Sequence, residues 1–165
     1  MKFSLVDRII ECNAKDSIKT VKNLTLGEEY LDDHFPGYPV MPGVLMIEAM
    51  VQSAGWLVRI ITGFSVSLIT LCSVSNIKYG KFIVPGDTLE LDIKLKSLEN
   101  GAASFRGKGT VNGVTAVSGQ FDIVYRNLAD NDKALAPNDK KLILTARKSF
   151  SAIGGEAFYV PPVHL

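Results

Sequence analysis

The sequence predicts an α+β fold in which one long buried helix is wrapped by a curved antiparallel sheet of about five to seven strands. Two observations carry this prediction. A nearly continuous apolar segment extends from Gly43 to about Ile61, and a helix that is apolar on all sides is typical of a protein interior. The second half of the chain alternates apolar and polar residues between Asn-Gly pairs, which is the pattern of half-buried strands joined by tight turns.

The first half of the chain supplies two strands, a loop and the helix. Residues 5–12 and 18–24 are predicted strands, and the turn-rich sequence NAKD separates them. An irregular, partly acidic loop then leads to Pro42. Proline is tolerated at a helix start and glycine suits a helix end, so Pro42 and Gly63 delimit the helix.

The second half is predicted to be a run of strands. Residues 68–74 form a short apolar run, and the segment from Leu89 to Leu95 alternates apolar and charged residues. The pairs Asn100-Gly101 and Asn112-Gly113 suit type I′ turns, because both central residues of such a turn need positive φ. They predict a meander of three long strands. The strands contain Gly107, Gly109 and Gly119, which indicate strong curvature or close backbone packing.

Composition limits the class of protein. The chain has 165 residues, 47% of them hydrophobic, and a net charge of +1, which fits one globular domain and gives no sign of a nucleic-acid partner. Cys12 and Cys72 lack metal-ligand spacing, so we expect a reduced, cytoplasmic setting. Residues 60–77 carry no charge, but they are too polar to span a membrane. We divide the chain into a domain of residues 1–127 and an extension of residues 128–165, which is expected to be partly flexible or a short helix.

The candidate catalytic residues lie in and just after the stretch HFPGYPVMPG. His34, one of two histidines in the chain, opens it, and Glu48 follows 14 positions later as the only acid of the helix. Apolar surroundings favour the protonated form of a carboxyl group, which can then act as a general acid. A neutral imidazole is the natural general base. Gln52 lies one helical turn after Glu48 and is placed to hold its side chain.

The predicted helix start supplies a third element. The amides of Gly43 and Val44 have no partner within the helix, and free amides at a helix N-terminus can stabilise an oxyanion or enolate. A base, an acid and an enolate site can remove a proton next to a carbonyl and expel a β-hydroxyl. The chain has no GxSxG, Walker or GxGxxG motif, and two histidines without a CxxC predict no metal site.

The segment HFPGYPVMPGVLMIEAMVQSAG closely resembles the active-site signature of the β-hydroxyacyl-[acyl carrier protein] dehydratases of the FabZ type. Two further segments, LVDRIIEC and IKYGKFIVPGDTLELDIKL, resemble other parts of that family, so that the likeness covers roughly residues 4–125. It implies a hot-dog fold and a homodimer with shared active sites, often assembled as a homohexamer (a trimer of dimers). It also implies a lyase of fatty acid or related acyl biosynthesis that converts (3R)-3-hydroxyacyl thioesters to trans-2-enoyl thioesters without a cofactor.

The resemblance also implies residue roles. His34 would take the α-proton, Glu48 would protonate the departing hydroxyl, and the Gly43 and Val44 amides would hold the thioester oxygen. Lys78 and Lys81 remain where the family has an arginine-rich run and would meet an acidic acyl carrier protein. Two solvated lysines are an equally good interpretation.

Two departures from the family pattern matter. The usual N-terminal lead before the first strand is missing, which leaves the acyl-chain length open, and residues 128–165 have no counterpart. Two alternatives to the dehydratase stay open. One is a hot-dog thioesterase or a hydratase running in the opposite direction, and the other is a non-catalytic hot-dog subunit that binds a carrier protein.

Overall fold

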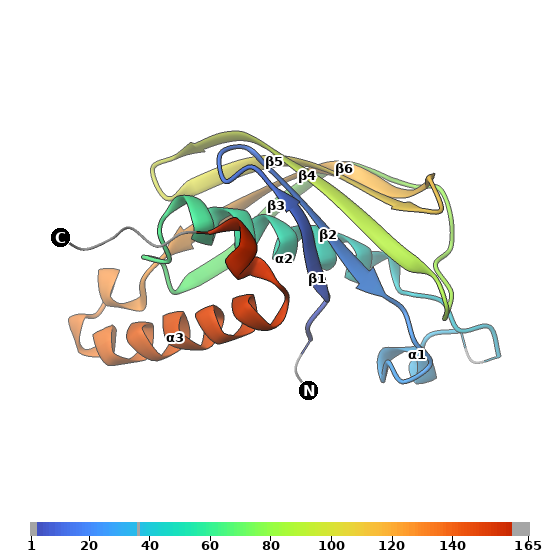
Figure 1. The fold of residues 1–165 in the computed structure, drawn as a ribbon, viewed down its shortest axis with the longest axis horizontal. Coiled ribbons are helices and arrows are strands. Elements are labelled where there is room, and N and C mark those ends of the chain that lie inside the picture. The colour runs from blue at the N-terminus through green and yellow to red at the C-terminus, as the bar shows by residue number, and fades with distance from the viewer. Residues whose placement is uncertain (1–2, 36, 160–165) are drawn as a thin grey trace.

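The computed structural model describes residues 3–35 and 37–159. Six antiparallel strands form one curved sheet in the order β1-β2-β4-β5-β6-β3, and a long helix lies across its concave face (Figure 1). The strands are β1 Arg8–Cys12, β2 Ser17–Asn23, β3 Leu68–Tyr79, β4 Thr88–Glu99, β5 Ala102–Val111 and β6 Val114–Arg126. The helices are α1 Tyr30–Asp33, α2 Gly43–Ile61 and α3 Ala136–Ala152, with short 3-10 turns η1 Leu128–Asp130, η2 Lys133–Leu135 and η3 Gly155–Phe158. The predicted fold class is confirmed.

The meander of β4, β5 and β6 follows the predicted turns. Asn100 and Gly101 have φ of 52° and 77°, and Asn112 and Gly113 have φ of 51° and 79°. Positive φ at both central residues matches the right-handed twist of the flanking strands, so each pair closes a two-residue hairpin. The predicted turn positions are therefore confirmed.

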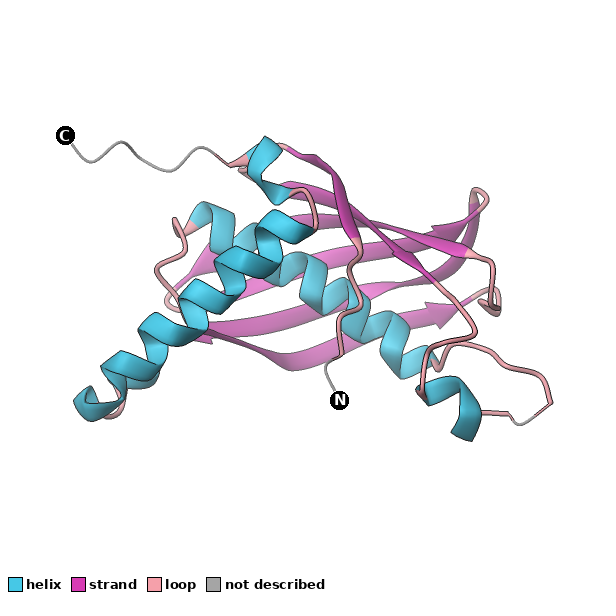
Figure 2. Ribbon diagram, turned by 60° about the horizontal axis from the view of Figure 1, so that its bottom comes forward, coloured by secondary structure: helices cyan, strands magenta, loops and turns pink. Residues whose placement is uncertain are grey.

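Helix α2 sits directly on the backbone of the sheet (Figure 2). A Cβ atom on Gly107 of β5 would lie 2.5 Å from Sδ of Met50 and 3.2 Å from the ring of Phe121. Glycine at this position therefore lets the helix and its neighbours approach the strand closely, as the sequence predicts. Beside this contact the hydroxyls of Thr20 and Ser53 lie 2.7 Å apart and satisfy each other inside the core.

One face of α2 is not covered, which corrects the prediction of a helix buried all round. Val44 is 68% exposed, and Leu45, Ile47 and Glu48 are only half-buried. The helix is long and apolar enough to cross a membrane by length and composition, but more than half of its apolar window is buried within the protein. The uncharged residues 60–77 contain the end of α2 and most of β3, so they do not form a spanning helix.

Strand β3 forms an edge of the sheet and is longer than the predicted run of residues 68–74. Two irregularities, between Leu71 and Ser73 and between Ser75 and Lys78, shift its register against β6. These bulges break the period-2 pattern, so the sequence does not reveal the second half of the strand. Helix α2 runs along β3 in the opposite direction, because Gly43 lies beside Tyr79 whereas Gly55 lies beside Ile69.

The C-terminal segment packs onto the far end of α2. Helix α3 has 17 residues, longer than the short helix expected, and Phe150 is buried with ring centroids 5.7 Å from Trp56 and 5.0 Å from Phe64. The amide of Ile9 in β1 donates to the carbonyl of Ile153 at 2.9 Å. The part of this segment from residue 160 on lies outside the described residues.

Asp139 anchors the start of α3. Its carboxylate accepts hydrogen bonds from the Ser67 hydroxyl and from the amides of Leu128 at 2.8 Å and Ala129 at 2.9 Å. Burial opposes ionisation of Asp139, but these three hydrogen bonds together hold its pKa below the usual value. The contact ties α3 to the start of β3.

We predict that Asp139→Asn lowers the midpoint of urea unfolding at pH 7. The ionised carboxylate accepts three hydrogen bonds, whereas in asparagine one of its two oxygens is replaced by an NH2 group, which cannot accept them. A lowered folded-state pKa stabilises the protein above the unfolded carboxyl value of about 4, and this contribution is lost as the pH falls through the folded-state pKa. The difference between wild type and variant should therefore shrink on acidification below about pH 4. Asp32→Asn, at an exposed carboxylate, is the control; an equal effect of both variants would contradict the anchor.

Candidate active site

A cavity of about 370 Å³ lies at the N-terminal end of α2. It brings together three residues singled out in the sequence, His34, Gly43 and Lys81. The remaining lining comes from the loop before α2, the first turns of α2 and the segment around the end of β3, and consists of Phe35, Val40, Met41, Met46, Tyr79, Gly80 and Phe82. A mostly apolar cavity with few polar groups is typical of a site for a small molecule or acyl chain.

His34 follows the single turn of α1 and is half-buried. Its ring meets the ring of Phe35 edge-on, with centroids 4.7 Å apart. Phe35 has φ of 54°, a left-handed conformation that costs a bulky residue about 1–2 kcal/mol. The loop is held by Tyr38 N–H to Phe35 O and by Met41 N–H to Ile83 O, both 2.9 Å. Strain that is held in place beside a candidate base indicates a fixed pose for the imidazole.

The N-terminus of α2 opens toward this cavity. The carbonyl of Pro42 accepts from the amides of Leu45 and Met46, whereas within the described part of the chain the amides of Gly43 and Val44 donate to no acceptor. Unpaired amides at this position carry the positive end of the helix dipole. They can therefore polarise a carbonyl that enters the cavity.

Glycine at position 43 makes room for a neighbouring aromatic ring, because a Cβ atom there would lie 2.9 Å from the ring of Tyr79. The Tyr79 ring occupies that space and forms a wall of the cavity. Sequence reasoning did not assign Tyr79 to the site, because the bulges in β3 hide which residues near its end point inward.

Glu48 lies on the uncovered face of α2 and is not among the residues that line the cavity. Gln52 donates to its Oε1 at 3.0 Å, the contact that their spacing predicts. Gln52 also accepts from the amide of Leu5 at 2.8 Å and donates to the carbonyl of Phe3 at 3.3 Å. The N-terminal segment thus fixes Gln52, and Gln52 fixes one oxygen of Glu48.

The two lysines considered for carrier binding lie in different places. Lys81 lines the His34 cavity and pairs with Asp87 at 3.7 Å. Lys78 lines a separate polar hollow on the sheet, together with Asn76, Arg106, Ser118, Gly119 and Gln120. The structure therefore brings Lys81, but not Lys78, to the cavity.

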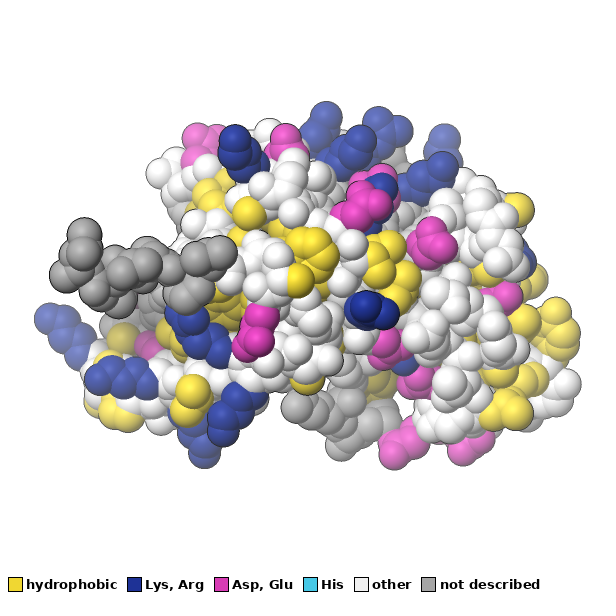
Figure 3. Space-filling model, viewed as in Figure 1, with side chains coloured by type: hydrophobic (Ala, Val, Ile, Leu, Met, Phe, Trp, Pro, Cys, Tyr) yellow, Lys and Arg dark blue, Asp and Glu magenta, His cyan; other side chains and the backbone are white. Residues whose placement is uncertain are grey.

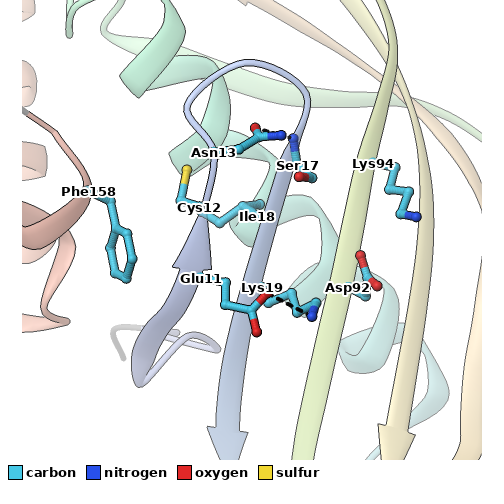
Figure 4. Close-up of a pocket in the computed structure, with 9 residues that line it drawn as sticks. All are labelled: Glu11, Cys12, Asn13, Ser17, Ile18, Lys19, Asp92, Lys94 and Phe158. Atoms are coloured by element: carbon cyan, nitrogen blue, oxygen red, sulfur yellow. Dashed lines mark hydrogen bonds and ion pairs between the residues drawn. The ribbon is translucent and has the colours of Figure 1, made fainter.

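A larger hollow of about 500 Å³ lies beside the β1–β2 turn (Figure 4). Its charged lining includes the exposed Lys19–Glu11 pair at 2.8 Å, and Phe158 points toward it from η3. Burial raises the pKa of the Cys12 thiol in its wall, which disfavours the reactive thiolate. The hollow contains none of the predicted site residues. Within residues 3–35 and 37–159 no three His, Cys, Asp or Glu residues cluster as metal ligands would.

A buried ion pair holds the start of the loop that leads to His34. Lys22 of β2 is only 5% exposed, and its Nζ lies 2.6 Å from Glu28 and 3.4 Å from Asp7. The carbonyl of Glu28 accepts from the amide of Leu31, which is a core residue of α1. Lys22 thereby links the sheet to the turn that directly precedes His34.

The long helix, the curved sheet that wraps it and the cavity at the N-terminal end of α2 define a protein of the hot-dog fold, and comparison with known proteins specifies the family. The FabA-like domain model matches residues 1–120. A 3-hydroxyacyl-[acyl-carrier-protein] dehydratase FabZ of Wolbachia pipientis wMel is 38% identical over 125 residues, covering 76% of this chain and 87% of its own length. The FabZ dehydratase of Lactococcus lactis subsp. cremoris MG1363 is 41% identical over 117 residues, covering 71% and 81%. The chain belongs to the FabA-like family.

Solved structures share the fold at lower identity. The dehydratase heterocomplex ApeI:P from Xenorhabdus doucetiae matches with a TM-score of 0.66 at 17% identity, over 81% of this chain and 90% of that one. A hypothetical thioesterase from Streptococcus pneumoniae solved with coenzyme A matches with a TM-score of 0.55 at 15% identity, over 73% and 88%. At such identities the likeness shows the fold alone, and it confirms the hot-dog fold.

We predict that Lys22→Met destabilises the protein by about 2 kcal/mol, because two partly buried carboxylates lose a charged hydrogen-bond donor. Activity at the His34 site should fall by more than the unfolded fraction accounts for, because the loop before His34 is released. Lys22→Arg should restore most of both properties. The measurements are urea unfolding and initial rates at a temperature where each variant is folded.

The matched control for this prediction is Lys19→Met, which removes an exposed lysine of the same strand from its pair with Glu11. Exposed pairs contribute little, so stability and rate should stay near wild type. If Lys19→Met and Lys22→Met behaved alike, the buried pair would not be positioning the loop.

Proposed function

We propose that the protein is a hydro-lyase that dehydrates 3-hydroxyacyl thioesters carried by acyl carrier protein, in fatty acid or related acyl-chain biosynthesis in the cytoplasm. The observation that supports this most directly is the His34 imidazole in a largely apolar cavity that is also lined by Gly43, the first residue of α2, whose amide donates to no acceptor among the described residues. The relatives named as FabZ dehydratases support the same substrate class.

The proposed mechanism needs only acid–base chemistry and no cofactor. The thioester oxygen lies against the Gly43 and Val44 amides, which stabilise the negative charge that develops on it. His34 removes a proton from the α-carbon. The electron pair of the broken C–H bond moves toward the thioester carbonyl and forms the enolate. The enolate then expels the β-hydroxyl, which takes a proton from Glu48 and leaves as water, giving the 2-enoyl thioester.

The acid in this mechanism is supplied by a second copy of the chain. Glu48 lies on the uncovered face of α2 and outside the His34 cavity, so one chain holds the base and the enolate site without the acid. The same face continues onto edge strand β3, where most side chains are exposed. Antiparallel pairing of two β3 edges would bury this surface, remove the open edge, and bring each Glu48 toward the other chain's His34 cavity. Assembly of three such dimers stays a prediction from the family resemblance.

The reaction is tested with a 3-hydroxyacyl-carrier thioester and the purified protein. We expect enoyl-thioester absorbance to appear without release of free thiol. Free thiol without enoyl absorbance would indicate a thioesterase. A series of acyl lengths, run with wild type, extends the test to chain-length preference.

We predict that His34→Ala and Glu48→Gln each lower kcat by about 100- to 10,000-fold, because each removes one partner of general acid–base catalysis. Glu90→Gln, at an exposed glutamate of β4, is the control and should be as active as wild type. If wild-type protein were no more active than His34→Ala on short, medium and long chains while still binding the carrier, the chain would be a non-catalytic carrier-binding subunit.

We predict that Val74→Lys converts the dimer to a folded monomer with little activity. Val74 is 44% exposed on β3, so a lysine there should change the stability of the separate monomer little. Between two paired β3 edges, however, the charge of the lysine would be buried without a partner. Light scattering gives the mass and circular dichroism the fold. Ile10→Lys, at a comparably exposed position on β1 at the opposite edge of the sheet, should leave mass and rate unchanged. A Val74→Lys dimer with normal activity would place the interface elsewhere.

A further inference from the structure

The outward face of α3 carries charge of one sign. Lys140, Lys141, Arg147 and Lys148 are all exposed, and Asp139, the only acid in the helix, is buried and used as the anchor. Figure 3 shows the lysine and arginine side chains gathered over the α3 end of the molecule, with apolar side chains among them. None of the ion pairs formed by the described residues involves these four cations.

An exposed leucine lies in the middle of this charge. Leu144 is 56% exposed. Lys140 and Lys141 precede it by four and three positions, and Arg147 and Lys148 follow it by three and four, so all four lie next to it on the helix surface. An apolar anchor ringed by cations fits a partner that presents an apolar side chain within an acidic surface. We call this set of five residues the α3 patch.

The α3 patch is rigidly held. The Asp139 hydrogen bonds fix the start of the helix, and Phe150 fixes its end in the core. Arg147 is itself held, because it donates to the carbonyl of Gly63 at 3.2 Å and lies over the ring of Phe64 at 4.7 Å. A preformed surface loses little conformational entropy when a partner binds.

In the proposed dimer, the α3 patch of one chain lies near the His34 cavity of the other chain. Helix α3 is tied to Ser67 at the start of β3, whereas the His34 cavity contains Tyr79 at the end of β3. In one chain the two therefore lie at opposite ends of the molecule (Figure 1). Antiparallel pairing of two β3 edges places the start of one strand beside the end of the other. This brings the α3 patch of one protomer to the end of the dimer where the other protomer's cavity lies.

We propose that the α3 patch is a docking surface for the acidic acyl carrier protein, and that a carrier held there by one protomer delivers its acyl chain to the other protomer's cavity. This inference rests on the proposed function. It concerns a segment beyond residue 120, where the match to the FabA-like domain model ends. The partner is assigned by charge complementarity, because the substrate's carrier is the acidic macromolecule that the reaction itself requires.

The test compares a carrier-bound substrate with a small thioester of the same 3-hydroxyacyl group on N-acetylcysteamine. The variant Lys140→Glu/Lys141→Glu/Lys148→Glu should lower kcat/KM for the carrier substrate by about tenfold or more, with a weaker dependence on salt. Its kcat/KM for the small thioester should equal that of wild type. Leu144→Ser should weaken carrier binding, measured by fluorescence anisotropy with labelled carrier, without a change in net charge.

The control variant Lys94→Glu/Lys96→Glu/Lys108→Glu makes the same change in net charge at exposed positions of β4 and β5. If it lowered the carrier rate equally, attraction by overall charge would replace docking at α3. An equal loss with both substrates for the α3 variant would mean that the helix supports the active site instead.

Charge-dependent binding of wild type to anionic lipid vesicles, with carrier kinetics unchanged in the α3 variant, would identify a membrane surface as the occupant. Because carrier binding is measured separately from turnover, a wild type that binds the carrier through α3 but dehydrates nothing would overturn the proposed function alone.

Discussion

The close seating of α2 on the sheet determines where the free amides at its N-terminus and the carboxyl group of Glu48 lie. Met50 can rest on Gly107 because no side chain separates them, and the helix then runs along β3 in the opposite direction. This places the free amides of the α2 N-terminus beside Tyr79 and the His34 loop, and it leaves the side of α2 that carries Glu48 uncovered. The separation of Glu48 from the His34 cavity follows from this packing arrangement.

The sequence predicts most of the fold because its signals are local. The Asn-Gly pairs need positive φ, and the apolar segment between Pro42 and Gly63 is long enough to show its ends, so the turns and α2 appear where expected. Strand β3 was predicted too short, because its two bulges destroy the alternation that a sequence pattern needs. The single turn of α1 before His34 is too short to leave any periodic signal.

The candidate site is predicted in part for a similar reason. His34, Glu48 and Gln52 carry distinctive chemistry at fixed spacing, and the structure places His34 in the cavity and Gln52 on Glu48. Tyr79 was missed, since its place against Gly43 depends on the register of a bulged strand. The uncovered face of α2 could not be foreseen either, because apolar residues on an uncovered helix face look the same in sequence as residues of the core. The anchoring of α3 by Asp139 likewise depends on a contact between segments that are 72 positions apart.

The central claim is that each active site combines the base of one chain with the acid of another. Mixing the inactive His34→Ala and Glu48→Gln proteins and allowing their dimers to exchange tests it directly. Half of the dimers would then carry one intact site and one doubly altered site, so the account predicts recovery of about a quarter of the wild-type rate. A mixture that stays as inactive as the two separate variants, although exchange is demonstrated by mass, would contradict it and place the acid and the base within the same chain.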